Sequence, residues 1–206
     1  MIEGITAAQR QALAELAPAL DEATYLAGGV AVAIRLHHRT SLDLDLFVRH
    51  DFDADRLAER LAPTIPSLRI VGRAPGTLHA EIVGVPVSIL ALRVPLLEPT
   101  SPVSNLPVPV ASLEDLACMK VAAIAGRGAA KDFWDLDELL DGGVAEGSLA
   151  KLLDLYRQKY GSDDVGHVVR SLAYFGDADT APLPRGLTPE RWDAIRRAQL
   201  QRVRAL

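Results

Sequence analysis

Residues 41–48 (SLDLDLFV) constrain the fold more than any other segment, because polar and apolar residues alternate strictly from Ser41 to Leu46. An alternation with a period of two is typical of a β-strand whose two faces have different surroundings. One face would carry Leu42, Leu44 and Leu46, and the other would carry Ser41, Asp43 and Asp45. The segment therefore predicts a strand with one leucine face in a core and one polar face that bears two carboxylates.

Length and composition narrow the class of protein. The chain has 206 residues, is 49% hydrophobic and contains a single cysteine, Cys118, which fits one globular domain or two small ones. No run approaches the roughly 20 apolar residues of a membrane span, so we expect no membrane partner. One cysteine and no charged-then-apolar leader predict a cytoplasmic protein.

The formal net charge of −5 argues against a generally basic nucleic-acid binder. The charge is unevenly spread, however. Residues 1–150 hold 12 basic and 20 acidic side chains, whereas residues 151–206 hold 10 basic and 7 acidic ones. Five arginines lie in the last expected helix: Arg191, Arg196, Arg197, Arg202 and Arg204. They indicate either a solvated helix face or a contact with an RNA backbone.

Five prolines between residues 95 and 109 form the densest proline stretch and predict a domain boundary. Before it we expect helices at 6–20 and 53–61, a further helix from Gly28 to residue 36, and strands at 24–27, 41–48, 68–72 and 78–92, the last broken into a hairpin. After it we expect helices at 112–125, 131–140, 148–160 and 188–206, with Ser112, Ser148 and Thr188 as caps. Thr6 and Gln9 have the spacing of a capping box.

Two features would cooperate in chemistry on phosphates. Gly28 and Gly29 follow a short strand and begin a helix, where bare N–H groups form a cradle for phosphate. Asp43 and Asp45 are spaced by about 7 Å along a strand, so their carboxylates can converge on divalent cations. Mg²⁺ binds carboxylate and phosphate oxygens together. The pattern predicts a site that holds a nucleotide through its phosphates and a metal.

Four segments together resemble one family. Residues 26–35 (LAGGVAVAIR) and 38–47 (HRTSLDLDLF) resemble the AbiEii/AbiGii toxins, which belong to the DNA polymerase β superfamily of nucleotidyltransferases. Residues 113–120 (LEDLACMK) and 127–136 (RGAAKDFWDL) are similar to that family's helical lysine and its Lys-Asp-x-x-Asp motif. The resemblance implies an α+β fold: a polymerase β-like nucleotidyltransferase domain with a short mixed sheet and flanking helices at 1–108, and a helical domain completing the nucleotide cleft at 109–206.

The same resemblance implies roles for ten residues. The triphosphate and its surroundings would be held by Gly28, Gly29, Arg39, Ser41, Asp132 and Asp135, and the catalytic residues would be Asp43, Asp45, Lys120 and Lys131, with Asp43 and Asp45 as Mg²⁺ ligands. The implied reaction moves a nucleoside monophosphate from a nucleoside triphosphate to an acceptor, which is tRNA for characterised relatives. The implied biology is the toxin half of a toxin–antitoxin pair, with a cognate antitoxin as partner.

One position departs from the family pattern. Superfamily members carry a third carboxylate, usually the base for the acceptor hydroxyl, within a later apolar strand, and residues 85–90 (VPVSIL) place Ser88 there. Glu81 precedes it, on the opposite face if the strand is regular. Three interpretations follow: Glu81 substitutes, the acceptor is activated otherwise, or the protein is a weak or inactive member.

Rival interpretations remain for the motifs. Asp43 and Asp45 could be the solvated face of an edge strand, and the acids near Lys131 could serve only the dipole of a helix N-terminus. Rival functions are a catalytically inert nucleotide-binding regulator and an aminoglycoside-type nucleotidyltransferase that acts on small molecules. Phosphatases of the aspartyl-phosphate type are disfavoured, because Phe47 stands where they usually carry Thr or Val.

Overall fold

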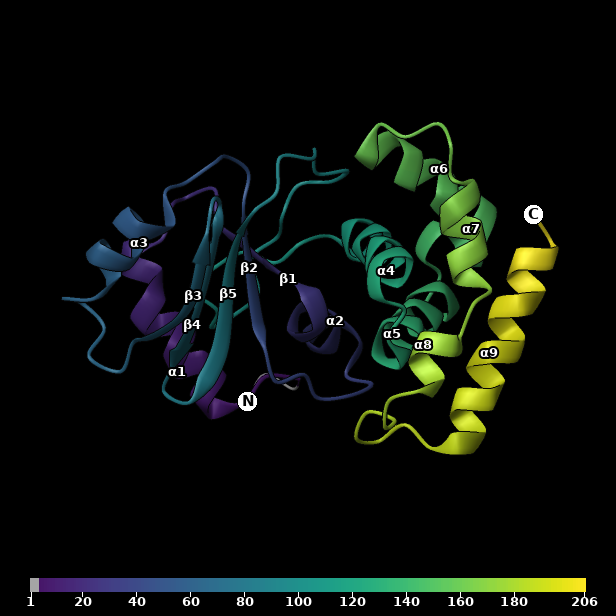
Figure 1. The fold of residues 1–206 in the computed structure, drawn as a ribbon, viewed down its shortest axis with the longest axis horizontal. Coiled ribbons are helices and arrows are strands. Elements are labelled where there is room, and N and C mark those ends of the chain that lie inside the picture. The colour runs from purple at the N-terminus through teal and green to yellow at the C-terminus, as the bar shows by residue number, and fades with distance from the viewer. Residues whose placement is uncertain (1–3) are drawn as a thin grey trace. The chain divides into compact units, whose positions relative to one another are not determined.

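A computed structural model describes residues 4–206 of the chain and divides it into two compact units. The first, here called the sheet unit, comprises Met1–Pro95 and Pro99–Ser112. The second, here called the helical unit, comprises Leu96–Glu98 and Leu113–Leu206. Figure 1 shows the labelled strands in the sheet unit and the long C-terminal helix in the helical unit.

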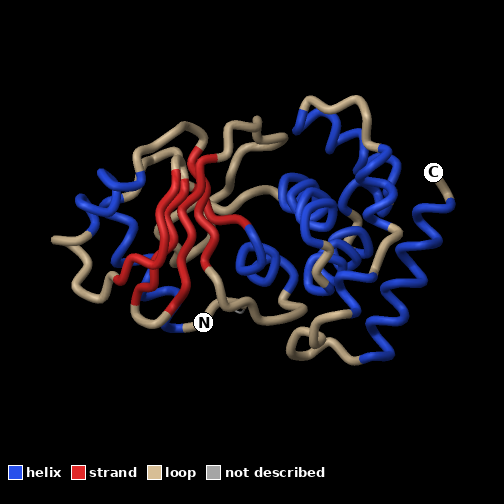
Figure 2. The backbone as a smooth tube through the Cα atoms, viewed as in Figure 1, coloured by secondary structure: helices blue, strands red, loops and turns tan. Residues whose placement is uncertain are grey.

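The sheet unit is built on a five-stranded mixed sheet (Figure 2), which confirms the expected α+β class. Its strands are β1 (Tyr25–Ala27), β2 (Leu44–Val48), β3 (Arg69–Ala74), β4 (Thr77–Ile82) and β5 (Val85–Ala91). Their order across the sheet is β1-β2-β5-β4-β3. The β2–β5 pair is parallel and the other pairs are antiparallel. The expected hairpin within 78–92 is confirmed as β4 and β5.

The alternation of β2 divides the sheet into two faces as expected, but Leu42, which was predicted on the buried leucine face, precedes the strand and is 74% exposed. Leu44, Leu46 and Val48 are buried, whereas Asp45 and Phe47 between them are half-buried. Helix α3 (Ala54–Leu61) lies on the buried face, since its Leu57 lines a cavity together with Val48. The opposite face carries the polar side chains on which the candidate site depends.

Two further helices contact strands of the sheet. Helix α1 (Ala7–Leu16) begins with the predicted Thr6–Gln9 capping box, which is confirmed, and contacts β5. It ends earlier than the predicted residue 20, because Pro18 starts a short 3₁₀ turn at Ala17–Ala19. Helix α2 (Gly28–Leu36) starts directly where β1 ends and contacts β1 and β2, as expected from the glycine pair.

The helical unit consists of packed helices without a sheet in the described residues. They are α4 (Leu113–Arg127), α5 (Ala130–Asp141), the 3₁₀ helix η2 (Val144–Gly147), α6 (Leu149–Tyr160), α7 (Gly166–Leu172), α8 (Gly176–Asp179) and α9 (Pro189–Arg204). Helix α4 packs on α5, α6 and α7, and α9 packs on α5 and α7. The predicted caps Ser148 and Thr188 are confirmed.

An aromatic cluster holds the helical unit together. The ring of Phe133 on α5 lies 5.0 Å from that of Phe175 and 5.8 Å from that of Trp192 on α9, measured between centroids. Phe133 and Trp192 are buried, as expected of core residues. Among residues 4–206, no helix has the length and apolar character that a membrane crossing requires.

Candidate functional site

Gly28 lies directly against the carboxylate of Asp45. The β1–β2 pairing sets Ala27 opposite Asp45, so the turn into α2 begins beside that side chain. Gly28 has a positive φ of 68°, and a Cβ there would come within 2.9 Å of both Cβ and Cγ of Asp45. Because non-glycine residues rarely adopt this conformation and no space exists for a side chain, both constraints require glycine.

Gly29 brings two further predicted residues to the same turn. A Cβ on Gly29 would lie 2.9 Å from Nη2 of Arg39 and closer still to Oγ of Ser41. The N-terminus of α2 therefore has a guanidinium, a hydroxyl and the Asp45 carboxylate around it. Four of the six residues predicted to bind the nucleotide, Gly28, Gly29, Arg39 and Ser41, lie together with Asp45 within the sheet unit.

A residue that sequence reasoning missed holds this loop in place. Gln9, only 2% exposed, donates from Nε2 to the backbone oxygens of Ser41 at 2.8 Å and Leu42 at 3.0 Å. The prediction of a strand from Ser41 was wrong at its start, because the strand begins at Leu44. Asp43 immediately precedes β2, and the capping box placed Gln9 on a helix without indicating this longer contact.

The donor set at this turn fits a magnesium ion shared with a nucleotide. Among residues 4–206, no group of three or more His, Cys, Asp or Glu side chains is placed to hold a metal. Mg²⁺ nevertheless binds through one or two carboxylates when substrate phosphates complete its shell. Asp45 lies beside the N-terminus of α2 and Asp43 stands two residues before it, so the two carboxylates fit this requirement, and their predicted role as metal ligands stays a prediction.

Ser88 lies opposite Asp45 in the parallel β2–β5 ladder. On its other side Ser88 faces His79 of β4, and Oγ of Ser88 lies 3.1 Å from Nδ1 of His79. Asp45, Ser88 and His79 thus form one row across three adjacent strands. Sequence reasoning missed His79, because only strand pairing brings it beside Ser88.

Glu81 requires a correction. A regular strand would have put Glu81 on the opposite face from Ser88, but the strand is interrupted and Glu81 pairs with Pro86, which shares a face with Ser88. The reason is the turn at Val83 and Gly84, whose φ values of 53° and 74° reverse the chain into a hairpin. The Glu81 carboxylate is engaged elsewhere, in an ion pair with Arg69 at 2.5 Å.

In the helical unit, Lys120 gathers the two aspartates of the Lys-Asp-x-x-Asp motif. Its Nζ lies 2.7 Å from Oδ2 of Asp135 and 3.1 Å from Oδ1 of Asp132. Both carboxylates are fully buried and Lys120 is 5% exposed. Asp132 also accepts two hydrogen bonds from Arg127, at 2.8 and 2.9 Å. These contacts join α4 to α5, and the predicted roles of these residues toward a nucleotide stay predictions.

The balance of forces on Asp132 keeps it ionised. Burial raises the pKa of this carboxyl, but the hydrogen bonds from Arg127 and the positive charge of Lys120 outweigh burial, so its pKa lies below the ordinary value. Lys131, the remaining motif residue, is half-buried and lines a cavity of about 270 Å³ with Arg127 and Asp177. Its predicted contact with nucleotide phosphates also stays a prediction.

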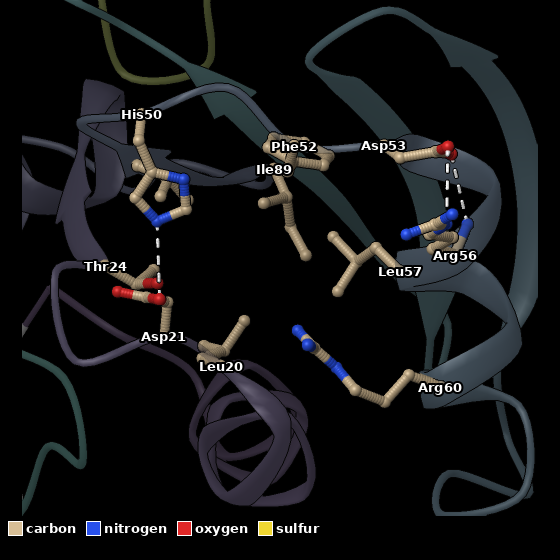
Figure 3. Close-up of a pocket in the computed structure, with 11 residues that line it drawn as sticks. Leu20, Asp21, Thr24, His50, Phe52, Asp53, Arg56, Leu57, Arg60 and Ile89 are labelled. Atoms are coloured by element: carbon tan, nitrogen blue, oxygen red, sulfur yellow. Dashed lines mark hydrogen bonds and ion pairs between the residues drawn. The ribbon is translucent and has the colours of Figure 1, made fainter.

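A separate cavity of about 280 Å³ lies on the buried face of the sheet (Figure 3). Val48 and Ile89 form part of its wall, so it is on the other face from Asp45 and Ser88. His50 and Asp21 form an ion pair at its edge, with Nε2 of His50 3.3 Å from Oδ2 of Asp21. This cavity is therefore not part of the site around Asp45.

The arginines of α9 divide into two groups. Asp137, which is buried, takes an ion pair from Arg191 at 2.8 Å and another from Arg202 at 2.5 Å. Arg196 pairs with Asp179 and Asp193. In the described part of the chain, Arg197 and Arg204 have no acidic partner and are exposed. The first group docks α9, and only the second is free to meet a ligand.

Comparison with known proteins supplies the identity. The family profile described as nucleotidyl transferase AbiEii toxin, Type IV TA system, matches residues 11–205. The chain is 36% identical over 156 residues to the uncharacterized Aquifex aeolicus (strain VF5) protein aq_aa25, covering 75% of this chain and 74% of that protein.

Solved structures share the fold. MenT4, a nucleotidyltransferase toxin of Mycobacterium tuberculosis H37Rv, superposes with a TM-score of 0.65 at 19% identity, covering 97% of this chain and 82% of that one. The antibiotic-resistance factor ANT(2″)-Ia superposes with a TM-score of 0.53 at 17% identity, covering 74% and 93%. The chain belongs to the AbiEii family of nucleotidyltransferase toxins.

Proposed function

We propose that the protein transfers a nucleoside monophosphate from a nucleoside triphosphate to tRNA, with Mg²⁺ held by Asp43 and Asp45. One observation carries this proposal: the backbone of Gly28 lies directly against the Asp45 carboxylate, and the side chains of Arg39 and Ser41 lie against Gly29. This arrangement supports a phosphate cradle next to a metal ligand.

Each part of the site has a task in this reaction. The N–H groups at the start of α2 bind phosphate oxygens, and the Arg39 guanidinium adds a positive charge beside them. When bound, Mg²⁺ neutralises charge on the phosphates and aligns the in-line displacement. Asp43 and Asp45 fix its position relative to the α2 N-terminus. The acceptor hydroxyl forms the new P–O bond as pyrophosphate leaves.

The acceptor and the biological setting rest on the family. Nucleotidyltransferase toxins are its members, and the sequence resemblance implies tRNA as the acceptor and a cognate antitoxin as partner. Arg197 and Arg204, exposed and unpaired in the described residues, are the side chains we expect to contact the tRNA backbone.

Labelling of total tRNA with each of the four α-³²P nucleoside triphosphates and Mg²⁺ tests the proposal. We expect incorporation by the wild type with at least one nucleotide, and loss of at least about 10²-fold in D43N and D45N, since each removes a charge from the metal site. D163N, at an exposed aspartate outside the site, is the matched control. Wild-type protein that labels no tRNA, or D45N with full activity, contradicts the proposal.

A small-molecule acceptor is the second candidate, because ANT(2″)-Ia shares the fold. The same assay with aminoglycosides in place of tRNA separates the two. If an aminoglycoside is labelled and tRNA is not, this chain acts on small molecules. The proposed role of Asp43 and Asp45 as metal ligands is the same for either acceptor.

A further inference from the structure

The proposed reaction leaves one proton without an acceptor. An attacking hydroxyl must lose its proton as the P–O bond forms, and a positioned side chain usually takes it. Asp43 and Asp45 are assigned to the metal, and the Glu81 carboxylate is paired with Arg69 at 2.5 Å. None of these three carboxylates is left without an assigned partner, so another group on this face of the sheet is a candidate for the base.

The row Asp45, Ser88 and His79 provides such a group. Adjacent strands are about 4.8 Å apart, so the Ser88 hydroxyl lies one strand from Asp45 and the His79 imidazole one strand further. Figure 1 shows β2, β5 and β4 side by side in this order. The 3.1 Å separation between Oγ of Ser88 and Nδ1 of His79 is that of a hydrogen bond.

The surroundings of His79 leave its ring available for proton transfer. Its side chain is exposed, and its neighbour on β3 is Gly72, which has no side chain to cover the ring. Among the described residues no carboxylate pairs with His79. With the proton on Nε2, Nδ1 accepts a hydrogen bond from the Ser88 hydroxyl, the arrangement in which serine can pass on a proton.

We propose that His79 receives the acceptor's proton through Ser88. This inference rests on the proposed function. As the acceptor oxygen bonds to the α-phosphorus and the bond to the pyrophosphate oxygen breaks, the acceptor proton moves to Oγ of Ser88, and the hydroxyl proton of Ser88 moves to Nδ1 of His79. The serine ends as it began, and the histidine ends protonated. Ser88 is the contact with the acceptor, and His79 acts behind it as a positioning residue.

The test is a double-mutant comparison in the tRNA-labelling assay. H79A should lower the labelling rate about 10²-fold or more, as loss of a base usually does. S88D places a carboxylate directly beside Asp45, which can accept the proton without help. H79A should therefore have almost no effect in the S88D background. A merely structural role for His79 would cost the same in both backgrounds.

Added imidazole gives a second readout that does not depend on S88D being active. It should restore labelling to H79A and leave D45N inactive. H50A is the matched control and should label like the wild type. His50 is an exposed histidine that lines the cavity on the opposite face of the sheet from Ser88. Thermal unfolding of each variant checks that the fold is intact.

The outcomes separate this inference from the proposed function. An active wild type with inactive D45N and fully active H79A overturns the inference alone. The inference alone is also overturned if H79A lowers the labelling rate and neither the S88D background nor added imidazole restores it. A wild type that transfers no nucleotide to any acceptor overturns both.

Discussion

The side-chain amide of Gln9 donates to the backbone oxygen of Ser41 across 32 positions of sequence, at 2.8 Å. The same amide reaches Leu42 at 3.0 Å, while its oxygen accepts the N–H of Thr6 to close the capping box. One buried glutamine therefore joins the start of the first helix to the segment that leads into Asp43. This contact fixes the backbone of residues 41 and 42, which lead into Asp43.

Q9A should loosen that segment without removing any proposed catalytic group. The two hydrogen bonds are part-buried, and a typical hydrogen bond contributes roughly 0.5–1.5 kcal/mol, so we expect the unfolding free energy to fall by about 1–3 kcal/mol. The rate of tRNA labelling should fall because Asp43 is less well placed. Chemical denaturation and the labelling assay measure the two effects. The exposed Gln11→Ala on the same helix should leave labelling unchanged.

Gly28→Ala should damage both stability and activity. The added Cβ would overlap the Asp45 side chain, and the φ of 68° is strained for alanine. We expect a loss of at least about 1–2 kcal/mol and of most nucleotide binding. Gly126→Ala is the control: Gly126 lies within helix α4 and its Cβ would meet no atom within 4 Å. That variant should gain roughly 0.5–1 kcal/mol.

D132N should destabilise the helical unit in a pH-dependent way. It leaves Arg127 and Lys120 short of a negative partner, and breaking a buried ion pair typically costs about 3–5 kcal/mol. Because the pKa of Asp132 is lowered in the folded protein, its stabilisation is complete above the ordinary value of 3.8 and is lost as pH falls through the lowered pKa. Denaturation at pH 7 and below pH 4 should show the wild-type advantage shrinking at the acidic end.

The two groups of α9 arginines should separate in experiment. R202A breaks the contact with buried Asp137 and should lower the unfolding temperature. R197A and R204A should leave that temperature within about a degree, as surface changes usually do. If α9 contacts tRNA, the R197A/R204A double variant should reduce tRNA labelling and flatten its salt dependence. Unchanged labelling at every salt concentration would remove α9 from the tRNA-binding surface.

Cys118 should be unreactive in the folded protein. Burial raises the pKa of its thiol to about 12, and the reactive species is the thiolate. A thiol reagent at pH 8 should titrate no cysteine in native protein and one per chain in denaturant. Rapid reaction under native conditions would mean that the helical unit opens easily around α4.

Local pattern was enough to predict several parts of the fold. The alternation around Asp43 and Asp45 identified strand β2, the Thr6–Gln9 spacing identified a capping box, and the glycine pair marked the start of a helix. Each depends on neighbours within four residues, where spacing and side-chain type decide the conformation. The short helices α7 and α8 were missed, since four to seven residues carry too little periodic signal.

Strand order and register are decided by contacts between distant segments, which no local pattern encodes. Only pairing placed Asp45 beside Ser88 and Ser88 beside His79, and only the turn at Val83 and Gly84 put Glu81 on the same face as Ser88. Burial, likewise, showed Lys120 enclosed between Asp132 and Asp135. The sequence by itself predicted which residues bind phosphate and metal. Tertiary structure decided which groups stand next to them, because packing fixes those distances.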